Sequence, residues 1–96
     1  MAEKIKIPCG WFVYKLNKNE LLKFQAVHCL GNVCDLCNEH LSEMYYIPVL
    51  NYGMCESCYM NWSMTAKYYP DDQNFEQQNI EWFESWKRYL HPFLDT

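Results

Sequence analysis

The chain has 96 residues, of which 50% are hydrophobic and 18% aromatic, with only three glycines and four prolines. This composition excludes a disordered chain and predicts one globular domain, although a core this small benefits from an additional cross-link. The formal net charge of −4, with Arg88 as the sole arginine, argues against a protein that coats nucleic acid through its charge.

The N-terminal third predicts a strand followed by a helix. Residues 11–16 (WFVYKL) are rich in aromatic and β-branched side chains, which favour a strand. Apolar residues at helical spacing then predict a helix over residues 19–28, capped by Asn17 or Asn19. Gly31 is expected to end this helix.

The middle of the chain predicts a second strand and a second helix. Residues 44–50 (MYYIPVL) read as a strand, and Pro48 should make it an edge or bulged strand because proline cannot donate to a sheet ladder. Residues 56–69 are compatible with a helix that Pro70 stops.

The last predicted helix is the most regular one. It should span residues 72–90, with Asp71 or Asp72 as its cap and Pro92 as its end. Its apolar stripe comprises Phe75, Asn79, Trp82, Phe83, Trp86, Tyr89 and Leu90. We expect Trp82, Phe83 and Trp86 to cover the strand at 44–50, and Glu76 to lie off the stripe.

Four of the six cysteines form two matched pairs. Cys34 and Cys37 precede Cys55 and Cys58 in the pattern C-x2-C-x17-C-x2-C, which is typical of a structural zinc site. Two cysteines three residues apart chelate one ion when a tight turn aims backbone N–H groups at the first thiolate. Asn38 follows the first pair and tolerates the left-handed conformation that such a turn requires. The sequence therefore predicts a structural Zn²⁺ bound by the four cysteines.

A cysteine knuckle, a hairpin and a second ligand pair that opens a helix resemble treble-clef zinc fingers, including LIM-like half-domains. The resemblance covers residues 33–67, and the chain departs from the usual pattern at Asp35, where proline is common, and at Asn38, where glycine is common. The wider stretch YYIPVLNYGMCESCYMNW and its aromatic C-terminal helix also resemble small zinc-finger proteins of bacteriophages and mobile elements.

These features together predict an α+β fold, a small zinc-stabilised treble-clef-like domain with a β-hairpin and a long C-terminal amphipathic helix. Residues 1–96 are expected to form one domain. It would consist of an N-terminal strand and helix at 1–32, a zinc finger at 33–69 and the C-terminal helix at 70–96.

The sequence fits other metal sites and redox chemistry less well than it fits zinc. A rubredoxin-type iron site would need glycine after each pair, and a redox pair would need a βαβ pattern. Cys9 and Cys29 are expected to be buried free thiols, since a second site with His28 lacks a fourth ligand. His40 could replace a cysteine ligand, but four cysteines favour a place for it outside the metal shell.

We expect no enzyme activity. Four cysteines leave no open coordination position on zinc, and catalytic motifs are absent from the sequence. The sequence has neither a secretory signal nor an apolar run long enough to cross a membrane, so a cytoplasmic location is expected, that of the host if a phage encodes the chain.

The expected function is protein binding. Tyr45, Tyr52 and Tyr68, together with Asp71 and Asp72, are predicted to form the partner surface, because aromatic side chains dominate interfaces. The phage resemblance implies an inhibitor of a host defence protein of the anti-CRISPR kind, whose partner is a nucleic-acid-binding nuclease complex.

The alternative is a zinc finger that binds nucleic acid within a transcription or recombination complex. Five lysines in residues 1–23 could then contact phosphates. Residues 34–67, however, carry one lysine against four acidic residues, so direct binding of nucleic acid is not expected.

Overall fold

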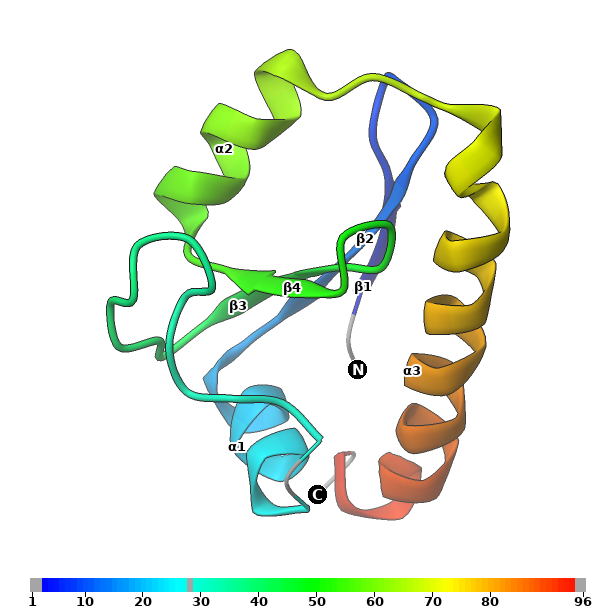
Figure 1. Cartoon of the computed structure of the whole chain (residues 1–96). Coiled ribbons are helices and arrows are strands. Elements are labelled where there is room, and N and C mark those ends of the chain that lie inside the picture. Colours follow the sequence, from blue (N-terminus) through cyan, green and yellow to red (C-terminus); the bar gives the residue numbers. More distant parts are fainter. Residues whose placement is uncertain (1–2, 28, 95–96) are drawn as a thin grey trace.

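The computed structural model describes residues 3–27 and 29–94, with side chains described as far as residue 90. The elements in chain order are β1 (Glu3–Lys6), β2 (Phe12–Leu16), α1 (Lys18–Ala26), β3 (Met44–Ile47), β4 (Tyr52–Met54), α2 (Glu56–Thr65), the 3-10 turn η1 (Pro70–Asp72) and α3 (Gln73–Leu94). The four strands form one antiparallel sheet in the order β1-β2-β3-β4 (Figure 1). The predicted α+β class, the β-hairpin and the long C-terminal helix are confirmed.

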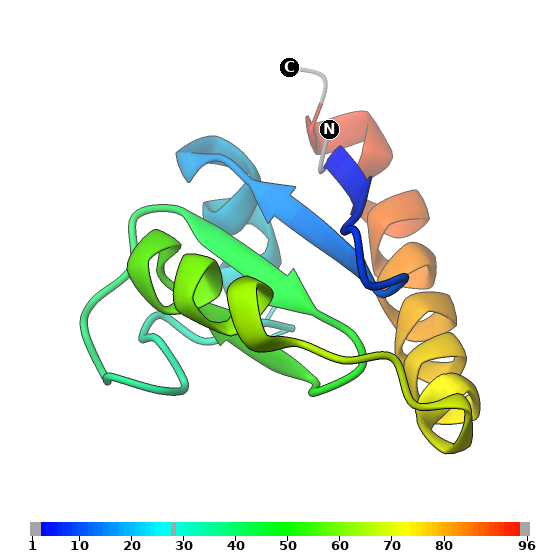
Figure 2. The same ribbon diagram turned by 90° about the horizontal axis from the view of Figure 1, so that it is seen from above.

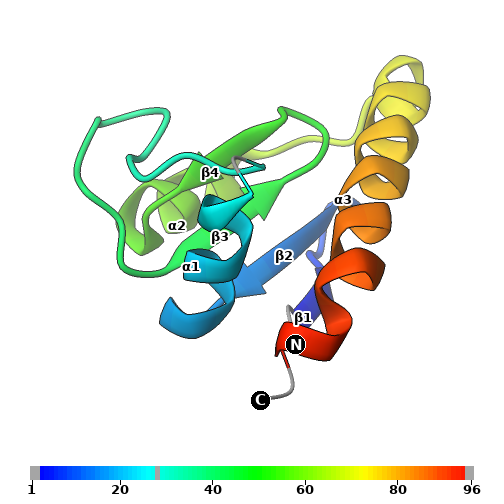
Figure 3. The same cartoon turned by 90° about the horizontal axis from the view of Figure 1, so that it is seen from below.

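The sheet separates two helical layers. Figure 2 shows α2 on one side of the sheet, and Figure 3 shows α1 and α3 on the other. The pairings Tyr14 with Tyr46 and Tyr46 with Gly53 place these residues on the face toward α1 and α3. The pairing of Tyr45 with Met54 belongs to the opposite face, toward α2.

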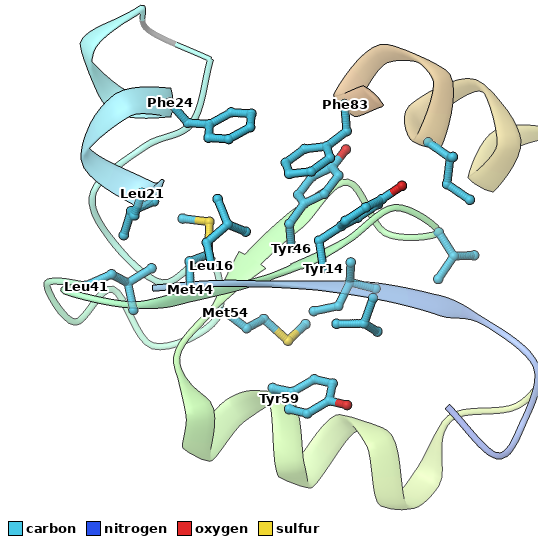
Figure 4. Close-up of a cluster of buried hydrophobic side chains, with 14 of the residues drawn as sticks. Tyr14, Leu16, Leu21, Phe24, Leu41, Met44, Tyr46, Met54, Tyr59 and Phe83 are labelled. Atoms are coloured by element: carbon cyan, nitrogen blue, oxygen red, sulfur yellow. The ribbon is translucent and has the colours of Figure 1, made fainter. Parts of the chain in front are cut away.

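Aromatic rings fill both faces of the sheet. Phe83 of α3 stacks on Phe24 of α1, with ring centroids 4.9 Å apart, and it also contacts Tyr14 and Tyr46 (Figure 4). On the other face Tyr59 of α2 packs against the sheet, as Figure 4 shows. Burial of these large rings, together with the aliphatic residues around them, supplies the hydrophobic stabilisation of the fold.

The N-terminal half agrees with the predicted elements with two differences. Asn17 caps α1, its side chain accepting from the Glu20 N–H while the Glu20 carboxylate accepts from the Asn17 N–H. Helix α1 ends at Ala26, so the prediction that Gly31 ends it is wrong. Strand β1 was not predicted, because its four residues, EKIK, are mostly charged and pair only with β2.

The prediction of an edge or bulged strand at residues 44–50 is wrong. Strand β3 lies inside the sheet, between β2 and β4, and ends at Ile47. Pro48 is the second residue of a turn in which the Leu50 N–H donates to the Ile47 carbonyl at 3.1 Å. Proline is favoured at that turn position, and it lies beyond the ladder that it would have interrupted.

Helix α2 ends at Thr65 rather than at residue 69, because the chain that follows it contacts Trp11, which lies between β1 and β2. The Trp11 indole N–H donates to the Lys67 carbonyl at 2.8 Å, and the Tyr68 ring packs on Trp11 at 4.4 Å. Both contacts need the extended backbone that begins at Ala66.

Helix α3 faces the sheet with part of the predicted stripe: Phe83 and Leu90 are buried as predicted, but Glu76, which was predicted to lie off the stripe, is buried with them. Glu76, Ile80, Phe83 and Leu90 are buried, whereas Phe75, Trp82 and Tyr89 are exposed. The reason is that the Glu76 carboxylate accepts a hydrogen bond from the Phe12 N–H at 2.8 Å, which rotates a charged residue inward. The helix also continues to Leu94, two residues beyond Pro92.

Asp71 and Asp72, predicted as alternative caps, lie in the 3-10 turn before α3 and not at an N-cap position. Both residues belong to η1, which begins after Tyr69 and has no side-chain cap. Their carboxylates lie at the start of α3, where the helix dipole favours negative charge.

Candidate metal centre

The first cysteine pair lies in a small hairpin of its own. Val33 and His40 form an antiparallel bridge, and the Cys34 N–H donates to the Glu39 carbonyl at 2.8 Å. The chain reverses through Asn38, which has a φ of 62° and whose N–H donates to the Cys34 carbonyl. The left-handed conformation predicted for Asn38 is confirmed.

The second pair lies where β4 gives way to α2. Cys55 is the N-cap of α2, and its sulfur accepts from the Cys58 N–H at 3.5 Å. Cys58 lies in the first turn of the helix. Both thiols therefore lie at the positive end of the helix dipole, which favours thiolates.

The two pairs meet at one point. The sulfur atoms of Cys34, Cys37, Cys55 and Cys58 all lie within 4.8 Å of one another, and those of Cys37 and Cys55 are 3.8 Å apart. Four sulfurs bound tetrahedrally to one Zn²⁺ at about 2.3 Å are themselves about 3.8 Å apart. The cysteines therefore fit a four-coordinate zinc ion, which would supply a structural cross-link when bound.

The pKa values of Cys34 and Cys58 are shifted in opposite directions, because their thiols share one small volume with those of the other two cysteines. Burial raises the pKa of Cys34, but hydrogen bonds from the backbone N–H groups of Cys55, Cys37 and Leu36 outweigh this effect and lower the pKa to about 6. The pKa of Cys58 is raised to about 12, first by its hydrogen bond with Cys55 and then by burial. One thiolate forms readily and opposes further ionisation, and a divalent cation removes this repulsion.

Asp35 joins the first cysteine pair to the hairpin that carries the second. Its N–H donates to the Gly53 carbonyl at 2.9 Å, and its carboxylate accepts from the Gly53 N–H at 2.7 Å. This role was not predicted, although Asp35 stood out as a departure from the usual proline. The two bonds hold the knuckle against β4, so they fix the distance between the ligand pairs.

The other candidate ligands lie elsewhere. Among the described residues, the cluster within ligand distance consists of the four cysteines alone. His40 is exposed opposite Val33, and Cys9 and Cys29 are half-buried free thiols. Burial raises the pKa of Cys29 to about 12, so it is a neutral thiol at pH 7. His28 lies outside the described residues.

The residues predicted to bind a partner have diverse surroundings. The half-buried Tyr45 stacks on Tyr59 with centroids 4.1 Å apart, and is therefore partly a core residue. Tyr52 and Tyr68 are each 39% exposed. The exposed aspartates of η1 lie together at the start of α3.

Comparisons with models of protein families, with curated proteins and with solved structures found no match to this chain. Within the described residues, no helix combines the length and the apolar character needed to cross a membrane.

Proposed function

We propose that this chain is a small, non-catalytic protein-interaction module whose finger is folded by zinc. The observation that carries the proposal is the convergence of four cysteine sulfurs within 4.8 Å. Four protein ligands fill the tetrahedral shell of zinc, which leaves no position for a substrate or an activated water. A closed site of this kind stabilises a fold, and the function then resides in the surface that the fold presents.

The chain order around the metal centre supports a treble-clef finger. A cysteine knuckle is followed by the β3–β4 hairpin, and the second ligand pair opens α2. In such fingers the free energy of metal binding contributes directly to folding, because the short elements bury too little surface to be stable alone.

The surface of α2 supports binding to a protein. Residues 57–66 carry no charged side chain, and Met60 and Met64 on this helix are 50% and 77% exposed. The centres of protein interfaces are depleted of charge and enriched in methionine and aromatic residues. Tyr52 and Tyr68, which precede and follow α2 in the sequence, are each 39% exposed.

A more specific proposal is inhibition of a host defence nuclease, in the manner of an anti-CRISPR protein. Its support is the phage resemblance and the acidity of the chain. The net charge of −4 falls further when four thiolates bind one Zn²⁺, because that centre carries −2. An acidic surface is complementary to a basic nucleic-acid channel.

The competing proposal, a nucleic-acid-binding finger, draws on the lysines of β1. Lys4 and Lys6 both lie over the Phe12 ring, with their Nζ atoms 4.5 and 5.7 Å from its centre. This basic edge is small, and any binding through it should weaken steeply with salt.

Affinity capture separates the two proposals. Tagged, zinc-loaded protein should retain one stoichiometric protein from a lysate of the natural host, before and after nuclease treatment. Tyr52→Ala should weaken that complex by about 1–3 kcal/mol without changing the zinc content or the melting temperature. Leu22→Ala is the matched control, because Leu22 is an exposed apolar residue of α1, which covers the other face of the sheet.

Retention of nucleic acid alone, lost on nuclease treatment, would favour the competing proposal.

The double variant with Asp71 and Asp72 changed to lysine should mainly slow association with the protein partner.

A further inference from the structure

A cavity lies next to the four-cysteine cluster. Asp35 and Gly53 line it, but none of the four cysteines does. It has a volume of about 270 Å³ and is bounded by the loop after α1, the β3–β4 hairpin and Trp82 of α3. Figure 3 shows this loop on the same side of the sheet as α1. The volume lies below the range of about 300–1,000 Å³ that holds drug-sized ligands, so the cavity suits a single long side chain.

The wall next to the metal centre is acidic. Asp35 is the one acidic side chain among the described residues that line the cavity. A carboxylate accepts up to about four hydrogen bonds, so the bond to the Gly53 N–H leaves acceptor capacity on Asp35. Cys34, the neighbour of Asp35, would add negative charge as a zinc-bound thiolate. The cavity therefore favours a cation.

Aromatic side chains also line the cavity. Trp82 is 38% exposed, and its ring lies 5.9 Å from that of Tyr46, which also lines the cavity. The Tyr46 hydroxyl donates to the Asn51 side-chain oxygen at 2.7 Å and is held in place by that bond. Cations are attracted to the faces of such rings, most strongly to tryptophan.

We propose that this cavity binds an arginine side chain of the partner protein, with the guanidinium paired to Asp35 and packed on Trp82. Arginine fits better than lysine, because its planar group stacks on aromatic rings and donates two parallel hydrogen bonds to one carboxylate. The inference rests on the proposed protein-binding function and names the chemistry of its partner. The surrounding acidity of the chain would guide a basic partner toward the cavity.

Titration of zinc-loaded, ¹⁵N-labelled protein with N-acetyl-arginine-methylamide tests the cavity without any partner. Saturable shifts are expected at the Trp82 indole N–H and at the backbone N–H groups of Asp35 and Gly53, with a dissociation constant in the millimolar range. The citrulline analogue, which has the same shape without the charge, should bind about tenfold more weakly or not at all.

Asp35→Asn and Trp82→Ala should each weaken binding of the arginine probe about tenfold. Asn at position 35 keeps an oxygen that can accept from the Gly53 N–H, and binding of the probe is compared between samples that each contain one measured equivalent of zinc. Tyr89→Ala is the matched control, because Tyr89 is an exposed aromatic of the same helix that does not line the cavity.

The proposal is overturned if the arginine probe gives no saturable shift, if citrulline binds equally well, or if a nucleoside monophosphate shifts the same resonances and arginine does not. Trp82→Ala should also weaken the captured complex about tenfold. A protein partner that binds Trp82→Ala at full strength would overturn the arginine site while leaving the protein-binding function intact.

Discussion

At the scale of single residues, the metal centre depends on backbone positions that few side chains tolerate. Asn38 has a φ of 62° directly after Cys37, in the region where an L-residue other than Gly, Asn or Asp is strained. Gly53 is buried in β4 and exchanges both of its backbone hydrogen bonds with Asp35. Each position gives a test of stability that leaves the ligands unchanged.

Asn38→Ala should destabilise the zinc-loaded protein by about 1 kcal/mol, whereas Asn38→Gly should be neutral or slightly stabilising, because glycine adopts positive φ without strain. Urea unfolding followed by circular dichroism measures both. Asn32→Ala, in the same exposed loop, controls for the loss of an asparagine. Equal destabilisation by glycine and alanine at position 38 would instead show that the asparagine side chain itself matters.

Gly53→Ala should destabilise the fold by about 1–3 kcal/mol, the usual effect of inserting a methyl group into a packed core. A Cβ at this position would lie 2.5 Å from the sulfur of Met44, which is itself buried. Gly31→Ala is the control, since no atom lies within 4 Å of the equivalent Cβ there. Thermal melting that ranks the two variants equally would contradict this packing.

At the scale of elements, α3 is attached to the sheet by polar as well as apolar contacts. The Phe12 N–H donates to Glu76, the Tyr14 hydroxyl donates to Glu84 at 2.5 Å, and the Asn79 amide donates to the Pro48 carbonyl at 2.9 Å. Burial and the Glu84 carboxylate raise the pKa of Tyr14, so its hydroxyl remains a donor at neutral pH. These bonds select the face that α3 presents to the sheet.

Glu76→Gln should reveal the cost of burying that carboxylate. Burial raises the pKa of Glu76 above 4.5, against the lowering effects of the Phe12 N–H and of Lys4 and Lys6. The folded state therefore binds more protons than the unfolded state just above pH 4.5, and stability falls as pH rises through the raised pKa. Glutamine keeps an acceptor for the Phe12 N–H but does not titrate.

The free energy of unfolding of Glu76→Gln, relative to the unmodified chain, should consequently rise with pH across this window and then level off. Urea unfolding at a series of pH values measures the difference, in which changes at the metal centre cancel. Glu81→Gln, on the exposed side of α3, is the matched variant. A difference that falls with pH would contradict the raised pKa.

At the scale of the whole molecule, one sheet connects the metal centre to the hydrophobic core. The β3–β4 hairpin, which leads into the second cysteine pair, pairs through β3 with β2, and β2 in turn pairs with β1. Loss of the metal should therefore destabilise the sheet as well as the finger.

Cys55→Ser should lower the zinc content below one equivalent and reduce stability by several kcal/mol, because metal binding in such fingers contributes on the order of 10 kcal/mol. Cys9→Ser should retain full zinc and most of the stability, since Cys9 lies outside the ligand cluster. Elemental analysis and thermal unfolding, with and without a chelator, measure these effects. A chelated protein that melts like the zinc-loaded one would disprove a structural role for the metal.

The sequence by itself determined the features that depend on residues near one another in the chain. The spacing of Cys34, Cys37, Cys55 and Cys58 identified the four cysteines that the fold brings within 4.8 Å of one another, and Asn38 marked the left-handed turn, because chelation geometry and φ preferences are local. Apolar periodicity likewise identified the long C-terminal helix and the α+β class.

The tertiary structure decided what depends on residues far apart in sequence. Glu76 lies inward, where its carboxylate accepts from the Phe12 N–H 64 residues away, and Trp82 of the same helix is left exposed. Helix α2 stops at Thr65 because Trp11 and Tyr68 pack together. The pairing of β1, the central place of β3 and the cavity beside Asp35 have the same origin. Contacts of this range override local preference, since burial and satisfied hydrogen bonds outweigh the fractions of a kcal/mol that propensities contribute.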